Sequence, residues 1–402
     1  MTVLMLCWEF PPFIAGGLGI ACHGIVKALL KLGIKIDLFL PARFPLYFRL
    51  EWPENADNLE PVFFLKRDEI NFRRKKFLSY RDKLKYLGLI PGSGPYLYNN
   101  GLMKRVINFK ETVSRFAHNL NFDIIHAHDW LTFPAALFLK QRVKKPFTAH
   151  IHSTEFDRSC GGGNELIKQI EHAGLTAADL ILAVSGYTKS ILAGKYGIEE
   201  NKIHIAYNAY SLTKNIETGR KTLKEPLVMF LGRLTEQKGP QYFLLTAEKV
   251  LKKLPGVTFV VAGEGNYKKE LIKKAEEYRI QDKVLFTGFL ERDEVANFLS
   301  AADILLMPSV SEPFGIAALE AIEFGTVVIT SRSAGITEVA ESVYKTDFWD
   351  TDTMAGIIIN LLKNPEQLKD RIDQSKREIE NITWHKTAQR IVELYLDITK
   401  SL

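Results

Sequence analysis

Two carboxylates stand eight residues apart in the segment 311–320, directly after a short apolar run. Pro313 is well placed as the first residue of a helix, with Glu312 at its cap. A helix rises about 1.5 Å per residue, so Glu320 would lie about 12 Å further along its axis. The free N–H groups of a helix N-terminus favour anions. The segment therefore predicts a bound diphosphate, with Glu312 beside a sugar and Glu320 beside a ribose. The alternative is a capped helix whose second glutamate only decorates the surface.

Two cations follow another apolar run, at 227–231. Arg233 comes directly after Gly232, and Lys238 follows five residues later. An arginine fork and a lysine point charge both suit the oxygens of a diphosphate. Taken alone, two cations on a loop are more often simply solvated.

Two His-x-His pairs end apolar runs: His126 with His128, followed by Asp129, and His150 with His152. Residues i and i+2 share one face of a strand, so each pair has the spacing of a metal site. A metal-dependent hydrolase is therefore one hypothesis. We favour hydrogen-bonding residues that hold a polar substrate, with the segment 155–163 as a loop that closes over it.

The first apolar run leads into a glycine-rich segment, 15–19, and then a helix. Glycines let the backbone approach a ligand closely. The dinucleotide pattern GxGxxG is incomplete here, because its last position is Cys22, and the second glycine pair at 263–265 has Lys268 in that place. A dehydrogenase is therefore disfavoured, although Asp37 in the second apolar run is compatible with one.

Short apolar runs alternate with amphipathic segments, which predicts parallel sheets with crossover helices. Helices are expected over 20–32 and 242–254. The expected strands are 3–8, 35–40, 123–127, 146–152 and 179–184 in the first half, and 227–231, 258–262, 283–287, 303–307 and 326–330 in the second.

These elements predict two Rossmann-like, doubly wound α/β domains, over residues 1–209 and 226–380. A polar linker covers 210–225, and a C-terminal helix within 381–402 is expected to cross between the domains. Ligands of open parallel sheets bind beyond the carboxyl ends of the strands, so the domains are expected to face a central cleft.

The composition is that of a globular protein, with 402 residues, 46% hydrophobic and 25% charged. Disordered, collagen-like and disulfide-scaffold proteins are excluded. Three scattered cysteines indicate a reducing compartment. With no 18-residue apolar run and no signal-peptide pattern, a cytoplasmic protein is predicted. The net charge of +6 does not favour a nucleic-acid partner.

The segment 66–85 carries nine Lys/Arg against three acids, with aromatic residues between them. It is compatible with peripheral contact to an anionic membrane, with an extended polar ligand, or with a solvated insertion.

Five motifs in this order resemble the retaining glycosyltransferases with two Rossmann-like domains, the GT-B fold, in families 4 and 5, and especially the glycogen and starch synthases. The resemblance spans almost the whole chain. The motifs are Glu9-Phe10-Pro11-Pro12 leading to Gly16-Gly17-Leu18-Gly19, His126-Ala127-His128-Asp129-Trp130, His152-Ser153-Thr154-Glu155, Gly232-Arg233 with Lys238-Gly239, and Glu312-x7-Glu320.

The resemblance implies catalytic roles for five residues. Arg233 and Lys238 would neutralise the donor diphosphate, and Glu312 would contact the donor sugar. His152 takes the place of the active-site histidine, and Asp129 that of an acidic residue on the acceptor side. The implied donor-binding residues are Gly16, Gly17, Gly232, Arg233, Lys238, Gly263, Gly288, Leu290, Glu312, Phe314, Gly315, Ile316 and Glu320.

The implied activity moves a hexose, glucose first of all, from ADP-glucose, UDP-glucose or a similar donor to an α-1,4-glucan, without a metal cofactor. Two positions depart from the bacterial glycogen synthase pattern: Ile14 replaces a lysine, and Asn208-Ala209 replaces Asn-Gly. A cell-envelope or lipid-linked acceptor with another sugar is the main alternative. A sugar-nucleotide epimerase and a non-catalytic sugar-nucleotide sensor are further ones.

Overall fold

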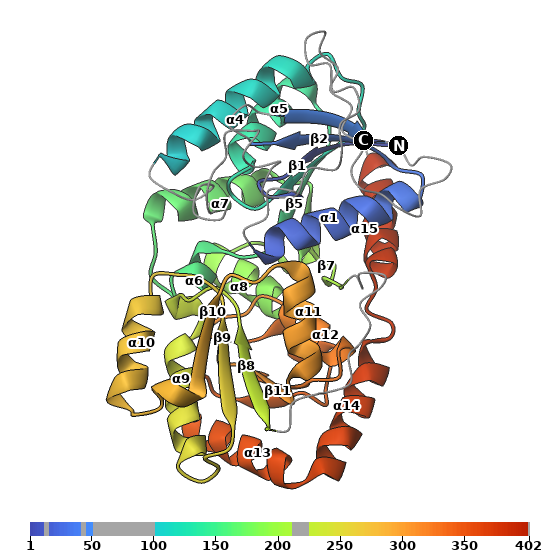
Figure 1. Ribbon diagram of the computed structural model, residues 1–402. Helices are drawn as coiled ribbons and strands as arrows, with labels where there is room; N and C mark the ends of the chain where they lie inside the picture. The colour runs from blue at the N-terminus through green and yellow to red at the C-terminus, as the bar shows by residue number, and fades with distance from the viewer. Residues whose placement is uncertain (12–15, 42–45, 51–100, 211–224, 401–402) are drawn as a thin grey trace, which may run out of the picture.

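The computed structural model of the chain describes residues 1–11, 16–41, 46–50, 101–210 and 225–400. It contains two α/β domains, one above the other in Figure 1, each built around a mainly parallel sheet. The predicted fold class is confirmed. Where the structure is described, no helix combines the length and apolar character needed to cross a lipid bilayer.

The first sheet has seven strands in the order β3-β2-β1-β4-β5-β6-β7, and only β2 and β3 pair antiparallel. Its strands are β1 (Thr2–Leu6), β2 (Lys35–Leu40), β3 (Leu46–Leu50), β4 (Ile124–His128), β5 (Phe147–Ile151), β6 (Leu180–Ala183) and β7 (Ile203–Ile205). The order reverses direction between β1 and β4, which is where ligands of such sheets bind.

Helices cover both faces of this sheet, which is why its central strands are continuous apolar runs. In β1, Val3 and Met5 belong to one buried apolar cluster, and Leu4 and Leu6 belong to another on the opposite face. The helices of this domain are α1 (Gly17–Lys31), α4 (Leu102–Ala117), α5 (Phe133–Val143), α6 (Glu155–Arg158), α7 (Glu165–Ala177) and α8 (Gly186–Tyr196), with a 3-10 turn at Glu200–Lys202.

The second sheet has six parallel strands in the order β10-β9-β8-β11-β12-β13 and reverses direction between β8 and β11. Its strands are β8 (Leu227–Leu231), β9 (Thr258–Ala262), β10 (Val284–Gly288), β11 (Ile304–Met307), β12 (Val327–Ser331) and β13 (Tyr344–Thr346). Its helices are α9 (Pro240–Leu251), α10 (Lys268–Glu277), α11 (Arg292–Ala301), α12 (Ile316–Glu323), α13 (Thr351–Lys363) and α14 (Pro365–Ile379), with 3-10 turns at Glu236–Lys238, Gln281–Lys283 and Gly335–Glu338.

The last helix, α15 (Trp384–Lys400), returns to the first domain and runs beside α1 (Figure 1). The contact is tight, because a Cβ built on Gly24 of α1 would lie 2.2 Å from the ring of Trp384. Thr387 Oγ1 donates to the carbonyl of Tyr207, at 2.7 Å. These two contacts therefore hold α15 against the first domain.

Each of the ten predicted strands is present, and those at 35–40, 227–231 and 258–262 have the predicted bounds. The structure adds β3, β7 and β13. These lie on sheet edges, and β7 and β13 have only three residues each, too few to produce a recognisable apolar pattern. Most of the predicted linker, residues 211–224, lies outside the described part of the chain.

Candidate active site

The ligand-binding edges of the two sheets meet at the N-terminal turns of two helices. In the first domain α1 follows β1, and in the second α12 follows β11. A Cβ built on Gly17, the first residue of α1, would lie 3.9 Å from Cδ1 of Ile316, the first residue of α12. The N–H groups that every helix leaves unpaired at its start therefore come from both domains to one place.

The helix that carries the second predicted carboxylate begins later than expected. The prediction that Pro313 opens it, with Glu312 at its cap, is wrong: α12 begins at Ile316, and Gly315 occupies the N-cap with φ 107°. Glu312 instead forms a parallel bridge with Ala334. Because this tertiary pairing keeps the backbone extended, the two acids do not share one helix, and the predicted spacing along its axis does not apply.

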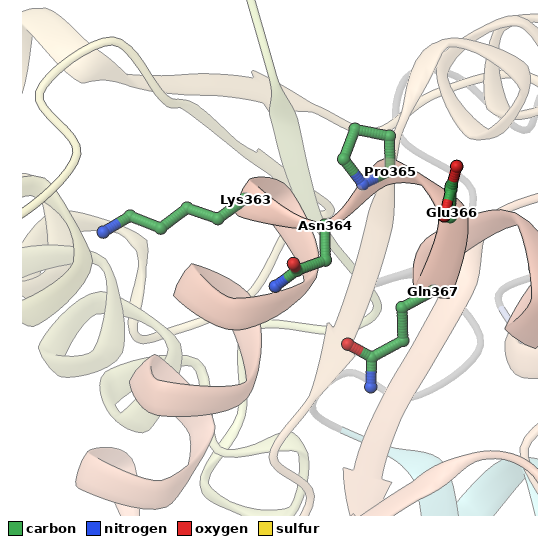
Figure 2. A pocket seen from close by; sticks show the side chains of 5 residues that line it. All are labelled: Lys363, Asn364, Pro365, Glu366 and Gln367. Atoms are coloured by element: carbon green, nitrogen blue, oxygen red, sulfur yellow. The ribbon is translucent and has the colours of Figure 1, made fainter.

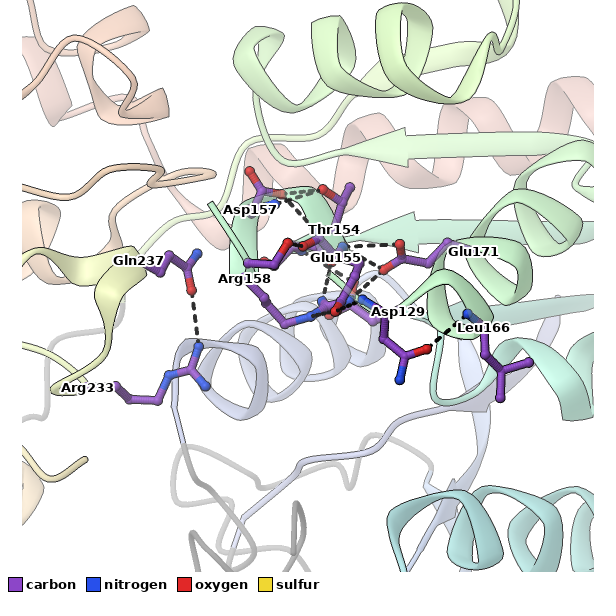
Figure 3. Close-up of polar contacts among 12 residues, drawn as sticks. Asp129, Thr154, Glu155, Asp157, Arg158, Leu166, Glu171, Arg233 and Gln237 are labelled. Atoms are coloured by element: carbon purple, nitrogen blue, oxygen red, sulfur yellow. Dashed lines mark hydrogen bonds and ion pairs between the residues drawn. The ribbon is translucent and has the colours of Figure 1, made fainter. Parts of the chain in front are cut away.

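The predicted cations lie beside this segment. Lys238 Nζ donates to Glu312 Oε2 at 2.6 Å, and Ser309 Oγ donates to the same oxygen at 3.2 Å. Arg233 is exposed, and one of its N–H groups donates to Gln237 Oε1 at 3.4 Å. Figure 3 shows Arg233 and Gln237 opposite a polar cluster of the first domain. The structure thus joins two predicted donor contacts, Lys238 and Glu312, in one ion pair.

Three of the predicted glycines meet at the carboxyl ends of β8, β9 and β10. The Gly263 N–H donates to the Gly288 carbonyl at 2.7 Å. A Cβ on Gly263, whose φ is 139°, would lie 1.9 Å from the carbonyl oxygen of Gly232. Leu290 is half-buried and packs against the apolar cluster that includes Ile316. The backbones at this edge of the sheet therefore pack so closely that a side chain at position 263 would not fit.

Four imidazoles stack across β4 and β5, as the predicted shared faces require. Ring centroids are 4.4 Å apart for His126 and His128 and 4.5 Å apart for His150 and His152. His128 Nδ1 lies 2.9 Å from His152 Nε2, and His126 Nε2 lies 3.2 Å from His150 Nδ1. Burial lowers the pKa of His152 to about 3. Burial and the neighbouring rings lower the pKa of the other three well below the usual value. All four are therefore neutral at pH 7. In each hydrogen-bonded pair, one ring donates a single N–H to the other ring.

Among the residues that the structure describes, two groups of three side chains have ligand atoms within 4.8 Å of one another, as a metal site would: His126, His128 and His150, and Cys7, Cys22 and His128. Both ring nitrogens of His126 already form hydrogen bonds, to Tyr395 and His150. A metal in the three-histidine group would have to break one of these bonds.

Asp129 is the buried residue that fixes the turn after His152. It adopts φ 57°, a left-handed conformation that aspartate tolerates better than most residues. Its Oδ1 accepts the His152 N–H at 2.7 Å. Burial raises the pKa of Asp129 to about 7, although Arg158 and this hydrogen bond oppose the shift.

The segment after His152 is anchored by a partly buried ion pair (Figure 3). Arg158 donates to Glu171 Oε1 at 2.5 Å and to the Ser153 carbonyl at 2.8 Å. Glu171 also accepts the Glu155 N–H, at 3.0 and 3.1 Å, and Glu155 Oε1 accepts the Asn164 N–H at 2.9 Å. Burial raises the pKa of Glu171, and Arg158 opposes this. The predicted loop 155–163 is therefore held at both ends.

Polar side chains then join the domains. Ser311 Oγ donates to Asp157 Oδ1 at 2.5 Å and lies 3.1 Å from the hydroxyl of Tyr187. Ser185 Oγ donates to the Pro313 carbonyl at 2.6 Å. No sequence pattern predicts these pairs, because the partners are more than 120 residues apart.

The N-terminus of α8 is held by a carboxylate of the other domain. Glu338 accepts the N–H groups of Gly186 and Tyr187, each at 2.7 Å. A carboxylate is favoured at this end of the helix dipole. The contact lies on the exposed rim of the domain boundary.

Two more acids shape the site. Glu9, which is buried, accepts the Gly16 N–H at 3.0 Å and so orients the start of α1. Glu320 is half-buried on α12. Burial raises its pKa to about 7, and Arg292 at the start of α11 partly opposes the shift. Arg292 is not among the predicted site residues, because one arginine at a helix start forms no pattern.

Some predicted features carry no structural result. Ile14 and the basic segment 66–85 lie outside the described residues. The surface hollow in Figure 2, at the junction of α13 and α14, contains none of the predicted site residues. It is lined by Lys363, Asn364, Pro365, Glu366 and Gln367.

Comparison with protein families matches the chain in two parts. Residues 15–214 match the model described as Glycosyltransferase Family 4, and residues 212–378 match Glycosyl transferases group 1. An uncharacterized glycosyltransferase of Methanocaldococcus jannaschii is 26% identical, over 98% of each chain. A glycogen synthase of Mycobacterium tuberculosis is 24% identical, over 98% of this chain and 94% of that protein.

Solved structures share the fold. The sucrose-phosphate synthase of Thermosynechococcus elongatus superposes with a TM-score of 0.76 at 18% identity, covering 100% of both chains. The catalytic domain of starch synthase IV from Arabidopsis thaliana, bound to ADP and acarbose, has a TM-score of 0.68 at 16% identity and covers 99% of both chains. At these identities the likeness concerns the fold.

Proposed function

Because the chain belongs to the glycogen and starch synthase-like glycosyltransferases of the GT-B fold, we propose that it moves glucose from a nucleoside-diphosphate sugar to an acceptor hydroxyl. The proposed donor is ADP-glucose or UDP-glucose, the proposed acceptor is an α-1,4-glucan, and the anomeric configuration is retained. The glycogen synthase relative and the starch synthase with bound ADP support this choice of donor and acceptor.

One observation carries the proposal: the N-terminal turns of α1 and α12 meet between the domains, at Gly17 and Ile316. Lys238 is tied by its ion pair to Glu312, just before α12, and Arg233 follows β8. Two helix N-termini and two cations at one domain boundary suit a ligand with two adjacent phosphates.

In the proposed reaction, negative charge develops on the departing diphosphate. Arg233, Lys238 and the N–H groups at Gly315 and Ile316 would stabilise this charge, which is commonly the largest catalytic contribution. These cations do the work that a metal does in other phosphate-transfer sites, so we propose that turnover needs no divalent metal.

The first domain supplies the groups around the sugar. His152 is proposed to lie beside the donor hexose, held in place by the bond from its N–H to Asp129. Glu312 is proposed to accept hydrogen bonds from the sugar hydroxyls. The departing phosphate then takes the proton of the attacking hydroxyl on the same face of the sugar. Contact between the domains excludes water and limits donor hydrolysis.

The test is nucleoside diphosphate release from ADP-, UDP- and GDP-sugars, with and without a glucan primer. Each reaction is run in parallel with a chelator. We expect release from ADP-glucose or UDP-glucose to rise with primer, and the chelator to leave it unchanged.

Release that is indifferent to primer would contradict the glucan acceptor and point to lipid or cell-envelope acceptors. Conversion of the donor without any acceptor would indicate an epimerase. Loss of activity in a chelator that leaves the melting temperature unchanged would contradict metal-independent turnover, and binding without release would contradict catalysis.

A further inference from the structure

Cys7, Cys22 and His128 come together inside the first domain, and the proposed reaction uses none of their side-chain atoms. Cys7 directly follows β1, Cys22 lies on α1, and His128 is the last residue of β4. All three are fully buried. The two sulfur atoms and one ring nitrogen lie within 4.8 Å of one another.

Two thiolates and an imidazole form a ligand set preferred by Zn²⁺, with bonds of about 2.3 Å to sulfur and about 2.0 Å to nitrogen. A tetrahedral ion with these bonds holds its ligand atoms roughly 3.5 Å apart. The three side chains offer three of its four ligands, from atoms that lie within 4.8 Å of one another, and a water molecule would take the fourth position. Neither cysteine is in a disulfide.

A second observation points to a ligand. His128 Nε2 is buried and has no hydrogen-bond partner within the described part of the chain. Its Nδ1 is paired with His152, so Nε2 is the ring nitrogen left for a metal. An unpaired buried nitrogen costs free energy that a metal bond would recover.

The neighbouring three-histidine group is a poorer site. His126 is bonded through Nδ1 to the Tyr395 hydroxyl and through Nε2 to His150. A metal there would displace one of these partners. In the cysteine-containing group, the bond that a metal would replace is the hydrogen bond between the Cys22 and Cys7 thiols, and a thiol is a weak donor.

We propose that Cys7, Cys22 and His128 bind one Zn²⁺ ion, with the thiol protons released to solvent on binding. Metal-binding histidines usually donate their other ring N–H to a neighbouring acceptor. His128 Nδ1 would then donate to His152 Nε2. The proton of neutral His152 would consequently reside on Nδ1. The ion is a structural part of the first domain and takes no part in sugar transfer.

The test uses the full chain, expressed and purified with Co²⁺ or Zn²⁺ supplied throughout, since a buried site fills most readily during folding. We expect one Co²⁺ per chain, near-ultraviolet sulfur-to-cobalt absorption and the intense visible bands of tetrahedral cobalt. Zn²⁺ is expected to raise the melting temperature, because it binds only the folded state.

Cys22→Ser and His128→Asn are expected to lose the bound metal. Cys160→Ser changes the one cysteine outside the cluster and is expected to retain both stoichiometry and spectrum. A wild-type chain without stoichiometric metal would overturn the proposal even if the variants failed to fold. An unchanged cobalt spectrum in Cys22→Ser would also overturn it. Because neither readout involves sugar transfer, these results are independent of the proposed function.

Discussion

Arg233 and Lys238 carry the same charge but are held differently. Lys238 is paired with Glu312 at 2.6 Å, whereas Arg233 is exposed and donates to the neutral amide of Gln237. Because the Arg233 guanidinium is exposed, it contributes little to the stability of the fold. A loss of activity on its removal would therefore report on the reaction more directly than a change at Lys238, which would also remove the cation paired with Glu312.

Arg233→Ala is expected to lower kcat by at least about a hundredfold, the usual loss when one preorganised donor to a developing charge is removed. Steady-state nucleoside diphosphate release measures it. Arg377→Ala, which removes an exposed arginine on α14, is the matched control and is expected to leave kcat unchanged. Wild-type kinetics in Arg233→Ala would contradict the role given to this residue.

Asp129 makes stability depend on pH in an unusual direction. Its pKa is about 7 in the folded state, against about 3.9 in an unfolded chain. Between these values the folded state binds more protons, so this residue lowers the free energy of unfolding as pH rises from about 4 to about 7. Above pH 7 the penalty is constant.

Asp129→Asn removes this titration but keeps an oxygen for the His152 N–H and a residue that tolerates φ 57°. The variant is expected to be more stable than the wild type at pH 8. The difference should shrink steadily towards pH 5. Urea denaturation across this range measures it, and a difference that stays constant with pH would show that Asp129 does not titrate there.

At the scale of elements, α1 and α15 pack closely for an identifiable reason. Gly24 leaves space for the Trp384 ring, and Trp384 begins α15. The glycine is needed for this approach and not for any unusual backbone conformation. The same helix α1 places Gly17 at the domain boundary. The packing of α15 on α1 therefore helps to position the proposed donor site.

Gly24→Ala is expected to destabilise the protein by about 1–3 kcal/mol, because the new methyl group overlaps the Trp384 ring. Gly194→Ala on α8 is the matched control: nothing lies within 4 Å of a Cβ built at that position, so the change should be neutral or stabilising. Thermal or urea denaturation of both variants measures the effect. Equal stabilities would contradict the tight packing of α15 on α1.

At the scale of the whole molecule, the domains share one buried apolar cluster, which includes Met5 and Ile316, and polar groups around α8 add to the contact between them. Among these polar contacts, the bond from Ser185 to Pro313 is buried, whereas Glu338 is exposed. A carboxylate at a helix N-terminus contributes about 0.3–1 kcal/mol when exposed. The balance between closed and open domains should therefore respond to single rim substitutions.

Glu338→Ala is expected to shift the ligand-free protein towards the open arrangement by up to about fivefold, the factor that about 1 kcal/mol supplies. The radius of gyration from X-ray scattering measures it, together with the ratio of donor hydrolysis to transfer, which should rise. Glu341→Ala removes a nearby exposed glutamate and serves as the control. If both variants matched the wild type, the Glu338 contact would have no part in closure.

The fold class and the shared faces of the histidine pairs could be predicted from the amino-acid sequence. Strands covered on both faces must be apolar throughout, and alternate strand residues must share a face; both properties depend on local periodicity. For this reason the ten apolar runs are strands, and the rings of His150 and His152 stack. The family motifs are likewise local stretches of sequence.

The start of α12 and the meeting of distant groups depend instead on tertiary contacts. Pro313 and Glu312 fit a helix start by local rules, but pairing with Ala334 holds Glu312 extended. The strand order places β1 beside β4, and α1 packs against both strands. This arrangement brings together Cys7, Cys22 and His128. Local periodicity contains no information on such contacts, since they depend on how elements far apart in the chain are stacked.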